Sequence, residues 1–441
     1  MLLLMIVVLP FLGLVLPLLA GHGRRALCTL LAALAPLVAL ALLLTLADAT
    51  LSGLVLQAGF EWLPGLGLNP GLRLDGLGLL FSLLILGIGL LVILYAHYYL
   101  GEDEPVGRFY AFLLLFMGAM LGLVLSANLL QMLVFWELTS LSSFLLIGFW
   151  GHRSDARRGA RMALAVTGGG GLALLAGILL IGQVVGSFDL ATVLAAGDLI
   201  RAHALYPLIL VLVLLGVFTK SAQFPFHFWL PHAMAAPTPV SAYLHSATMV
   251  KAGVFLLARL YPALSGTDLW FYLVSFTGLI TLLFGAVMAL FQHDLKGLLA
   301  YSTISHLGLI TLLFGLDTRL AAVAAVFHII NHATFKASLF MAAGIIDHET
   351  GSRDMRRING MWHYMPHTAV LAMVAASAMA GVPLLNGFLS KEMFFAETLS
   401  STHLGGFGWL IPAGATLAGA FAVAYSLRFI HDVFFNGEPI N

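Results

Sequence analysis

The chain has 441 residues, of which 61% are hydrophobic and 9% are charged, and its 20 basic residues balance its 20 acidic ones. So apolar a composition excludes a soluble globular protein, and no nucleic acid is expected as a partner. Cys28 is the only cysteine, which excludes an internal disulfide and a multi-cysteine metal or iron–sulfur site.

Apolar stretches of about 18 to 25 residues recur along the chain, and about 20 helical residues cross the hydrocarbon core of a membrane. Residues 208–217 lack the alternation of polar and apolar side chains that strands of a membrane β-barrel show. We therefore expect an all-α polytopic membrane protein with about 13 transmembrane helices. Their predicted centres lie near residues 11, 37, 88, 116, 139, 170, 212, 249, 280, 307, 333, 375 and 420. Residues 1–20 are expected to form a retained helix and not a signal peptide, because no basic residue precedes them.

Basic residues are distributed unevenly between the predicted spans. Odd-numbered connections hold Arg24, Arg25, Arg108, Arg153, Arg157, Arg158, Arg161, Arg353, Arg356 and Arg357, and even-numbered connections hold Arg73, Arg201, Arg259 and Arg319. Cytoplasmic loops carry the excess of arginine, so the N-terminus is predicted to face outward. The cluster at residues 153–161 is interpreted as a topological anchor, with ligand binding as the alternative.

Two predicted spans are interrupted. The first runs to Lys220 and then meets Pro225, and the second reaches Gly381 and Pro383 and continues to Lys391. Proline and glycine at these places are expected to break a membrane helix.

The two breaks lie about five spans apart, which predicts that one is inverted relative to the other. We expect N-terminal transmembrane helices in residues 1–106, a first inverted five-helix repeat in residues 107–261 and a second in residues 262–441, each with one discontinuous helix. Broken helices at matching places in inverted repeats indicate an ion path in transporters, and two unrelated kinks are the alternative.

Several ionisable residues lie inside predicted spans, where a charge costs at least roughly 2.5 to 3.5 kcal/mol. They are Glu137, Lys220, His245, Lys251, Lys296, His328, His332, Lys336, Lys391 and Glu392. Each is therefore a candidate for proton translocation.

His328, His332 and Lys336 are spaced four residues apart, which places them on one helix face over about 12 Å. A neutral imidazole both donates and accepts a hydrogen bond, so this ladder is interpreted as a proton relay. Its steps of about 6 Å require bridging water. A metal site and purely structural hydrogen bonds remain alternatives, but no cysteine or carboxylate lies within one further turn.

A lysine whose contact with a carboxylate is made and broken takes up and releases a proton in turn. We propose Glu137 and Lys220 as such a pair, while Lys251 either replaces Lys220 as the partner of Glu137 or supports helix packing. Lys296 and Lys391 are predicted as further relay positions. For Lys296 the alternative is a wet loop, and for Lys391 it is a snorkelling interfacial pair with Glu392.

The glycine run at residues 168–171 is not a nucleotide-binding loop, because no Lys and Ser or Thr follow it and it lies within an apolar span. Close helix packing is the better interpretation. Likewise, no nucleophile, base and orienting acid cluster in the sequence, and no cofactor motif is present. We expect an ion transporter without cofactor or resident metal, and not an enzyme.

The chain resembles the antiporter-like subunits of respiratory complex I and its relatives over most of its length. The resemblance rests on Phe135–Trp136–Glu137–Leu138, Lys220–Ser221–Ala222–Gln223–Phe224–Pro225, Pro237–Thr238–Pro239–Val240–Ser241–Ala242, residues 245–253, Asp294–Leu295–Lys296 and Ala300–Tyr301–Ser302–Thr303. Within that superfamily, Lys251, residues 305–308 and residues 386–395 are most similar to the large A subunit of Mrp-type multisubunit sodium/proton antiporters.

The resemblance implies a hetero-oligomeric complex in the cell (inner) membrane that exchanges Na⁺ for protons. It also implies that Glu137, Lys220, Lys296 and Lys391 occupy key positions. His245, His328, His332 and Lys336 would lie along the proton path. The large A-type protein is usually far longer, so the chain is either a fragment or a shorter relative.

Two other interpretations remain open. The chain could be a proton-pumping module of a redox complex, such as complex I or a membrane-bound hydrogenase. It could also be a structural scaffold whose ionisable residues no longer transport protons. Proton flux in variants of Glu137 or Lys391 separates the scaffold from the transporters.

Overall fold

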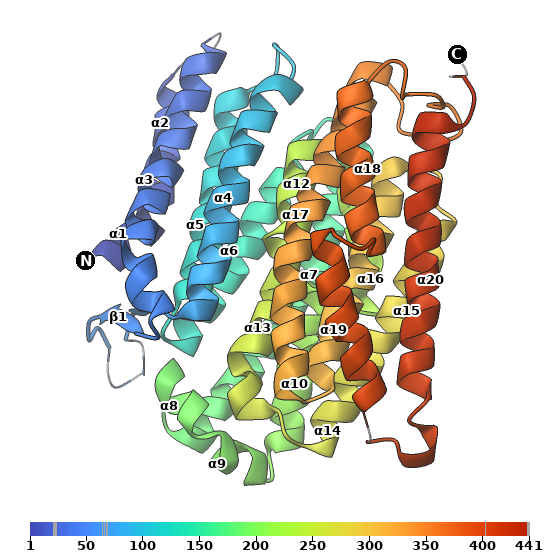
Figure 1. Cartoon of the computed structure of the whole chain (residues 1–441). Coiled ribbons are helices and arrows are strands. Elements are labelled where there is room, and N and C mark those ends of the chain that lie inside the picture. Colours follow the sequence, from blue (N-terminus) through green and yellow to red (C-terminus); the bar gives the residue numbers. More distant parts are fainter. Residues whose placement is uncertain (21–23, 64, 66, 68, 402, 439–441) are drawn as a thin grey trace. The chain divides into compact units, whose positions relative to one another are not determined.

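The computed structural model describes the chain except for residues 21–23, 64, 66, 68, 402 and 439–441 (Figure 1). The fold is helical, with 11 helices in the described residues that are long and apolar enough to cross a membrane. Two shorter apolar helices, α10 (Tyr206–Lys220) and α18 (Pro366–Ala380), precede the two predicted breaks. The prediction of an all-α polytopic membrane protein is confirmed. The count of about 13 spans and the inverted repeats are consistent with this architecture and stay predictions.

The chain forms two compact units, which divide the sequence at the first break. Unit 1 comprises Met1–Lys220 and Ala235–Leu264, and unit 2 comprises Ser221–Met234 and Ser265–Asn441. The boundaries predicted at residues 106 and 261 separate internal repeats and not compact units. This division therefore does not test them, and they stay predictions.

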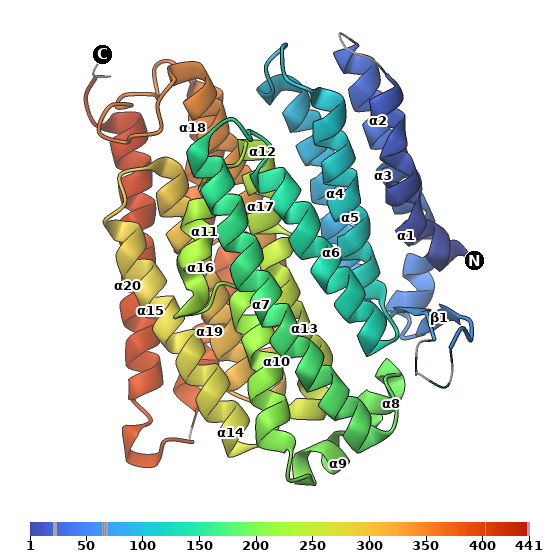
Figure 2. The same cartoon turned by 180° about the vertical axis from the view of Figure 1, so that it is seen from behind.

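Unit 1 is built from the N-terminal helices and the first group of ionisable side chains. Its helices are α1 (Leu2–Gly13), α2 (Val15–Leu19), α3 (Arg25–Leu51), α4 (Gly76–Tyr99), α5 (Val106–Leu125), α6 (Leu129–Ile147), α7 (Ser154–Val185), α8 (Leu190–Ala195), α9 (Gly197–Ala202), α10, α12 (Thr238–Ser246) and α13 (Met249–Leu264). The long helix α7 packs against both α6 and α10, and Figure 2 shows it between them. This packing places the candidate residues of α6 and α10 against one helix.

Unit 2 contains the second break and the histidine ladder. Its helices are α11 (Trp229–His232), α14 (Asp268–Trp270), α15 (Phe276–Leu290), α16 (Leu295–Gly315), α17 (Arg319–Thr350), α18, α19 (Asn386–Ser400) and α20 (Leu410–Ile430). α16 packs between α15 and α17, while α20 packs against α15 and α18. In Figure 1, α19 continues below α18 after a short interruption.

Side chains fix the helix starts that matter for the site. Asn128 caps α6 by accepting hydrogen bonds from two backbone N–H groups, and Asp294 caps α16 by accepting one from Gly297 at 2.7 Å. Such caps satisfy N–H groups that the first turn of a helix leaves unpaired. Both candidate-bearing helices therefore begin at a defined residue.

Both predicted helix breaks are present. After Lys220 the chain leaves the helix, and Ala222 adopts φ +48°. After Ala380, Gly381 adopts φ +88° and Leu384 φ +75° before α19 begins. Positive φ reverses the direction of the chain and ends a right-handed helix, so the breaks are built into the backbone.

A short antiparallel hairpin joins α3 to α4 and was not expected from the sequence. β1 (Leu56–Gly59) pairs with β2 (Gly71–Leu74). The hairpin is fastened to α6 because Gln131 Oε1 accepts a hydrogen bond from Gly71 N at 2.8 Å.

A buried ion pair joins the start of α4 to α13. Asp75 caps α4 and binds Arg259, whose Nη2 lies 3.0 Å from Asp75 Oδ1 and whose side chain is only 4% exposed. Burial alone would raise the pKa of Asp75, but the hydrogen bond and the charge of Arg259 outweigh it and lower that pKa to about 2.

Asp75→Asn is expected to destabilise the protein by about 3 to 5 kcal/mol, because Arg259 would keep its charge without its partner. The wild-type stabilisation should be fully present above pH 3.8, the ordinary pKa of Asp, and be lost as pH falls through about 2. Thermal unfolding in detergent between pH 6 and pH 2 measures both effects. The control is Asp155→Asn, which breaks an exposed pair with Arg153 and should change stability by less than about 1 kcal/mol.

Candidate functional site

Lys220 ends α10 in the interior of unit 1. Its side chain is fully buried, and Nζ donates to the Trp136 carbonyl at 3.1 Å and to Ser140 Oγ at 2.7 Å. Lys220 Nζ also lies 5.2 Å from the centre of the Trp136 ring. Two neutral oxygens and an aromatic face therefore surround this amino group inside the unit.

Glu137 follows Trp136 on α6 and is half-buried. Its Oε1 is buried without a hydrogen-bond partner among the described residues, and Lys220 forms no ion pair with it there. The predicted Glu137–Lys220 pair is thus separated in this structure, although Lys220 binds the residue next to Glu137. Pairing would require a movement of one side chain or a bridging water, and it stays a prediction.

The glycine run on α7 makes room for these side chains. A Cβ atom on Gly171 would overlap the Glu137 carboxylate, and one on Gly170 would overlap the Thr219 side chain. Gly169, in contrast, faces open space. The run allows close helix packing, as predicted, and part of what packs there is the candidate carboxylate itself.

His245 and Lys251 lie on either side of the junction between α12 and α13. Both are fully buried. α12 ends at Ser246 and α13 begins at Met249, so a short interruption separates the two side chains. The structure places both in the interior of unit 1, together with Lys220.

Lys296 lies in the first turn of α16 in unit 2. His293 is exposed in the preceding turn, but the Lys296 side chain is only 2% exposed. The wet-loop alternative is therefore wrong for Lys296.

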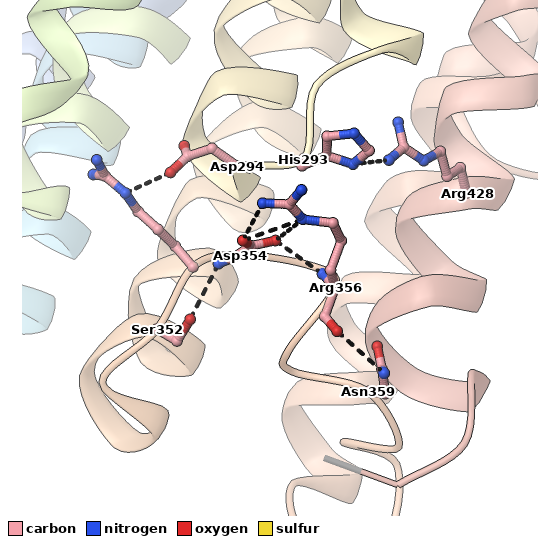
Figure 3. Close-up of polar contacts among 8 residues, drawn as sticks. His293, Asp294, Ser352, Asp354, Arg356, Asn359 and Arg428 are labelled. Carbon is pink, nitrogen blue, oxygen red and sulfur yellow. Dashed lines mark hydrogen bonds and ion pairs between the residues drawn. The ribbon is translucent and has the colours of Figure 1, made fainter. Parts of the chain in front are cut away.

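A polar network at the end of unit 2 holds this turn in place (Figure 3). Asp294 pairs with Arg353 Nε, and Arg428 Nη2 lies 2.7 Å from His293 Nδ1. Asp354 binds Arg356 Nη2 at 2.7 Å, and that hydrogen bond, together with the charge of Arg356, lowers the pKa of Asp354 to about 2. The network fixes the residues that position Lys296.

A hydrogen-bonded chain of side chains runs through unit 2. His328 on α17 contacts Ser390 Oγ on α19 through Nδ1 at 2.9 Å and His306 Nδ1 on α16 through Nε2 at 3.0 Å. His306 Nε2 in turn lies 3.4 Å from the Tyr425 hydroxyl on α20. Four helices thus contribute one group each to a continuous chain of exchangeable protons.

The donor and acceptor of each hydrogen bond in this chain follow from Ser390, the residue at its end. The Ser390 hydroxyl donates to the Gly387 carbonyl at 3.3 Å, so it accepts from Nδ1 of His328. His328 Nε2 then accepts from His306 Nδ1, and His306 Nε2 accepts from Tyr425. Along this chain every donor is matched to an acceptor, and each of its two imidazoles can take up a proton on one nitrogen and release one from the other.

The predicted ladder on α17 is present, with one addition. His328, His332 and Lys336 are all fully buried on one helix, and the two histidine rings lie 6.4 Å apart. The His306 ring lies 5.2 Å from each of them. His306 of α16 therefore lies beside the step from His328 to His332, which was expected to need a bridging water.

Lys336, at the far end of the ladder, is held by α16. Its Nζ donates to the Leu299 carbonyl at 3.2 Å and to the Ser302 hydroxyl. Lys220 in unit 1 is held in a similar way, by one carbonyl and one serine. Among the described residues, no three His, Cys, Asp or Glu side chains are placed to hold a metal ion.

Lys391 on α19 binds the C-terminal end of α18, the helix that precedes the second break. Its Nζ donates to the carbonyls of Met379 at 2.8 Å and Ala380 at 3.1 Å, the last residues of α18. The negative end of the α18 dipole stabilises the ammonium there. Glu392 is exposed while Lys391 is 6% exposed, so the interfacial pair that was the alternative does not form.

A small cavity connects Lys391 with the histidine chain. It has a volume of about 20 Å³ and is lined by Ser305, His306, Lys391 and Tyr425 among others. A volume of this size has room for one water molecule, although most of the cavity wall is apolar. Lys391 and His306 thus share a space in which a single water could link them.

The sequence alone did not assign a role to His306, Ser390 or Tyr425. His306 stands alone in an apolar helix, without a titratable residue one turn away, so periodicity gave no signal. A histidine in the middle of a membrane span is itself unusual, and that signal could have found it. The chain's only lysines, Lys220, Lys251, Lys296, Lys336 and Lys391, are at most 6% exposed.

The chain matches known proteins along most of its length. A family described as "NADH:quinone oxidoreductase/Mrp antiporter, TM" matches residues 126–416. A second, described as "NADH-Ubiquinone oxidoreductase (complex I), chain 5 N-terminus", matches residues 62–110.

Individual relatives agree with these families. A probable K⁺/H⁺ antiporter subunit of the A/B type from Rhizobium meliloti is 65% identical over 88% of this chain and 39% of its own length. The A subunit of a Na⁺/H⁺ antiporter from Alkalihalophilus pseudofirmus is 47% identical over 96% of this chain and 55% of its own length. A solved chain of the Mrp complex from Dietzia sp. DQ12-45-1b superposes with a TM-score of 0.90 at 40% identity, over 97% of this chain and 47% of that one. The chain spans about half the length of these relatives, or less.

Proposed function

Because the chain belongs to the NADH:quinone oxidoreductase/Mrp antiporter transmembrane family, we propose that it is the proton-translocating part of a multisubunit antiporter that exchanges Na⁺ for protons. It would act as an ion-transporter subunit, with other subunits of the complex as its partners. We place it in the cell membrane as a multi-pass protein with its N-terminus outside, on the positive-inside rule.

The observation that carries this proposal is the buried chain Ser390–His328–His306–Tyr425. Its members are within hydrogen-bond distance, and its donors and acceptors are consistently directed. Two histidines hydrogen-bonded to each other beside a buried lysine are rare in a purely structural core, because each buried polar group carries a desolvation penalty. Proton transfer gives this arrangement a purpose.

The proposed path in unit 2 has three parts. Lys336 and His332 receive a proton on α17, His306 and His328 pass it between α16 and α17, and Lys391 takes it through water in the small cavity. Lys391 then exchanges it at the break after α18. Lys296 and Glu392 are kept as predicted positions of the same path.

In unit 1, Glu137 and Lys220 form the proposed switch, with His245 and Lys251 as further carriers. When the Glu137 carboxylate approaches Lys220, the ammonium form is stabilised, and when it withdraws, the proton is released. The unpartnered Oε1 of Glu137 among the described residues and the neutral partners of Lys220 fit the separated state.

The cation is the part of the proposal on which the names of the relatives differ. The 47% identical relative is named for Na⁺/H⁺ antiport, whereas the 65% identical relative is named for K⁺/H⁺ antiport. Exchange of K⁺ is therefore the second candidate. The family description also covers redox-driven complexes, but both relatives are named as antiporter subunits.

The test is proton flux in everted vesicles that contain the assembled complex, with Na⁺ or K⁺ added in turn. We expect cation-dependent alkalinisation of the vesicle lumen that Glu137→Gln abolishes without loss of assembly. Flux unchanged by Glu137→Gln would favour the scaffold interpretation. Flux driven only by NADH oxidation would favour a redox-driven pump.

His306→Gln is expected to lower cation-coupled proton flux by roughly 100-fold. Glutamine can keep hydrogen bonds but cannot take up a proton on one nitrogen and release it from another, and positioned proton transfer contributes about 10² to 10⁴ in rate. Flux per assembled complex is the measurement. His348→Gln, at an exposed position on α17, is the control and should leave flux unchanged. Equal flux in both variants would remove His306 from the path.

A further inference from the structure

A positively charged pocket lies in unit 1, and none of the described lysines lines it. It forms where α5 begins, α6 ends and α7 begins, and has a volume of about 520 Å³. Arg108, Arg157, Arg161 and His152 line it, and no aspartate or glutamate does so among the described residues. All three helices are candidate membrane spans, so the pocket lies at the membrane boundary.

The three arginines of this pocket have no carboxylate partner in the part of the chain that the structure describes. Arg108 makes no hydrogen bond there and lies over the Phe149 ring, 5.1 Å from its centre. Arg157 Nη1 donates to the carbonyls of Gly151 and His152 at 2.8 and 3.0 Å, and Arg161 Nε donates to the Arg157 carbonyl at 3.3 Å. Since a guanidinium has five N–H donors, each arginine keeps donors for a ligand.

Arg153, in the same segment, differs from these three arginines because it forms an ion pair. Arg153 is paired with Asp155, with Nη2 2.6 Å from Oδ2, and it does not line the pocket. Topological anchoring explains why this segment is basic. It does not explain why three exposed arginines line one cavity and form no ion pair with the described residues, an arrangement that an anion would stabilise.

Apart from its three arginines and His152, the pocket is lined by apolar residues. Phe112 and Phe144 line it from α5 and α6. A ligand that fits both parts has an anionic head for the arginines and a hydrocarbon chain for the aromatic wall. Basic pockets at the ends of membrane helices bind anionic lipid headgroups in this way.

We propose that this pocket binds an anionic phospholipid, with its headgroup phosphate on Arg108, Arg157 and Arg161 and an acyl chain against Phe112 and Phe144. Binding here is independent of proton translocation, because none of these residues belongs to the relay. A complex that fails to transport protons could still bind the lipid, and the reverse also holds.

The test is native mass spectrometry of the purified full chain, titrated with phosphatidylglycerol or with phosphatidylcholine. We expect phosphatidylglycerol to bind and phosphatidylcholine not to bind. In the triple variant Arg108→Gln, Arg157→Gln, Arg161→Gln, the affinity for phosphatidylglycerol should fall on the order of 100-fold, at about 1 kcal/mol for each arginine. Arg158→Gln is the matched control, because Arg158 is exposed on the same helix but does not line the pocket.

Two further measurements keep the test decisive. If the triple variant does not fold, Arg108→Gln alone should still lower the affinity roughly fivefold, and its guanidinium makes no hydrogen bond to the described residues that folding would need. Millimolar inorganic phosphate should not displace the lipid. Equal binding of both lipids, unchanged affinity in these variants, or full displacement by phosphate would overturn the proposal. The proposal would also be overturned if an acidic segment of a partner protein covered the pocket arginines in the delipidated complex.

Discussion

Lys391→Met should reduce cation-coupled proton flux by roughly 10² to 10⁴, the contribution of a positioned proton-transfer group. Methionine fills a similar volume but cannot carry a proton. The loss should be larger than for any other single lysine, because Lys391 joins the helix break to the cavity it shares with His306. Flux in vesicles, divided by the amount of assembled complex, is the measurement.

A matched substitution separates the two roles that Lys391 could have. Lys391→Arg keeps a positive charge and donors for the Met379 and Ala380 carbonyls, but arginine does not release its proton in proteins. If Lys391 relays protons, the arginine variant should assemble normally and be as inactive as the methionine variant. Recovery of flux in Lys391→Arg would mean that the lysine only caps α18.

Gly171→Ala is expected to lower flux nearly as much as loss of the Glu137 carboxylate itself. The added Cβ would occupy the space of that carboxylate, so Glu137 must move away from its present place between α6 and α7. The change is one methyl group on a helix where alanine is otherwise favoured. Vesicle flux, together with the thermal stability of the purified chain, tests it.

Gly169→Ala is the control for this prediction, two residues away on the same helix. Nothing lies within 4 Å of its added Cβ. We expect normal flux and a stability gain of about 0.5 to 1 kcal/mol, because alanine loses less conformational entropy than glycine in a helix. Equal flux in Gly169→Ala and Gly171→Ala would contradict a functional role for the position of the Glu137 carboxylate.

The helical fold and its two breaks were predictable from the sequence because each depends on local chemistry. Apolar length sets a membrane span, and Pro225, Gly381 and Pro383 mark the places where a helix cannot continue. The β1–β2 hairpin was not predicted. Its strands are short, and one of them is fastened by a side chain of α6, a contact between distant parts of the sequence.

The candidate site was predictable in its members and not in its connections. A lysine inside a span is visible in the sequence, and all such lysines proved to be buried. Which groups they contact depends on the rotation and height of neighbouring helices. For this reason the sequence did not indicate that Lys220 would meet the Trp136 carbonyl, or that His306 would stand beside His328.

Adjacent residues illustrate the same limit. Lys391 and Glu392 are neighbours in the chain, and a pair between them was a reasonable alternative. Successive residues of an α-helix point about 100° apart, so one side chain enters the bundle and the other leaves it. Only the packing of α19 decides which of the two is inside.

The burial of every lysine gives the protein an unusual chemical property. Apart from the N-terminal amine, its surface offers no primary amine to acylating or reductive-methylation reagents. Labelling of a lysine would therefore report that reagent and water have entered the interior. Mass spectrometry of lysines modified during turnover would show the order in which the five lysines become accessible to water.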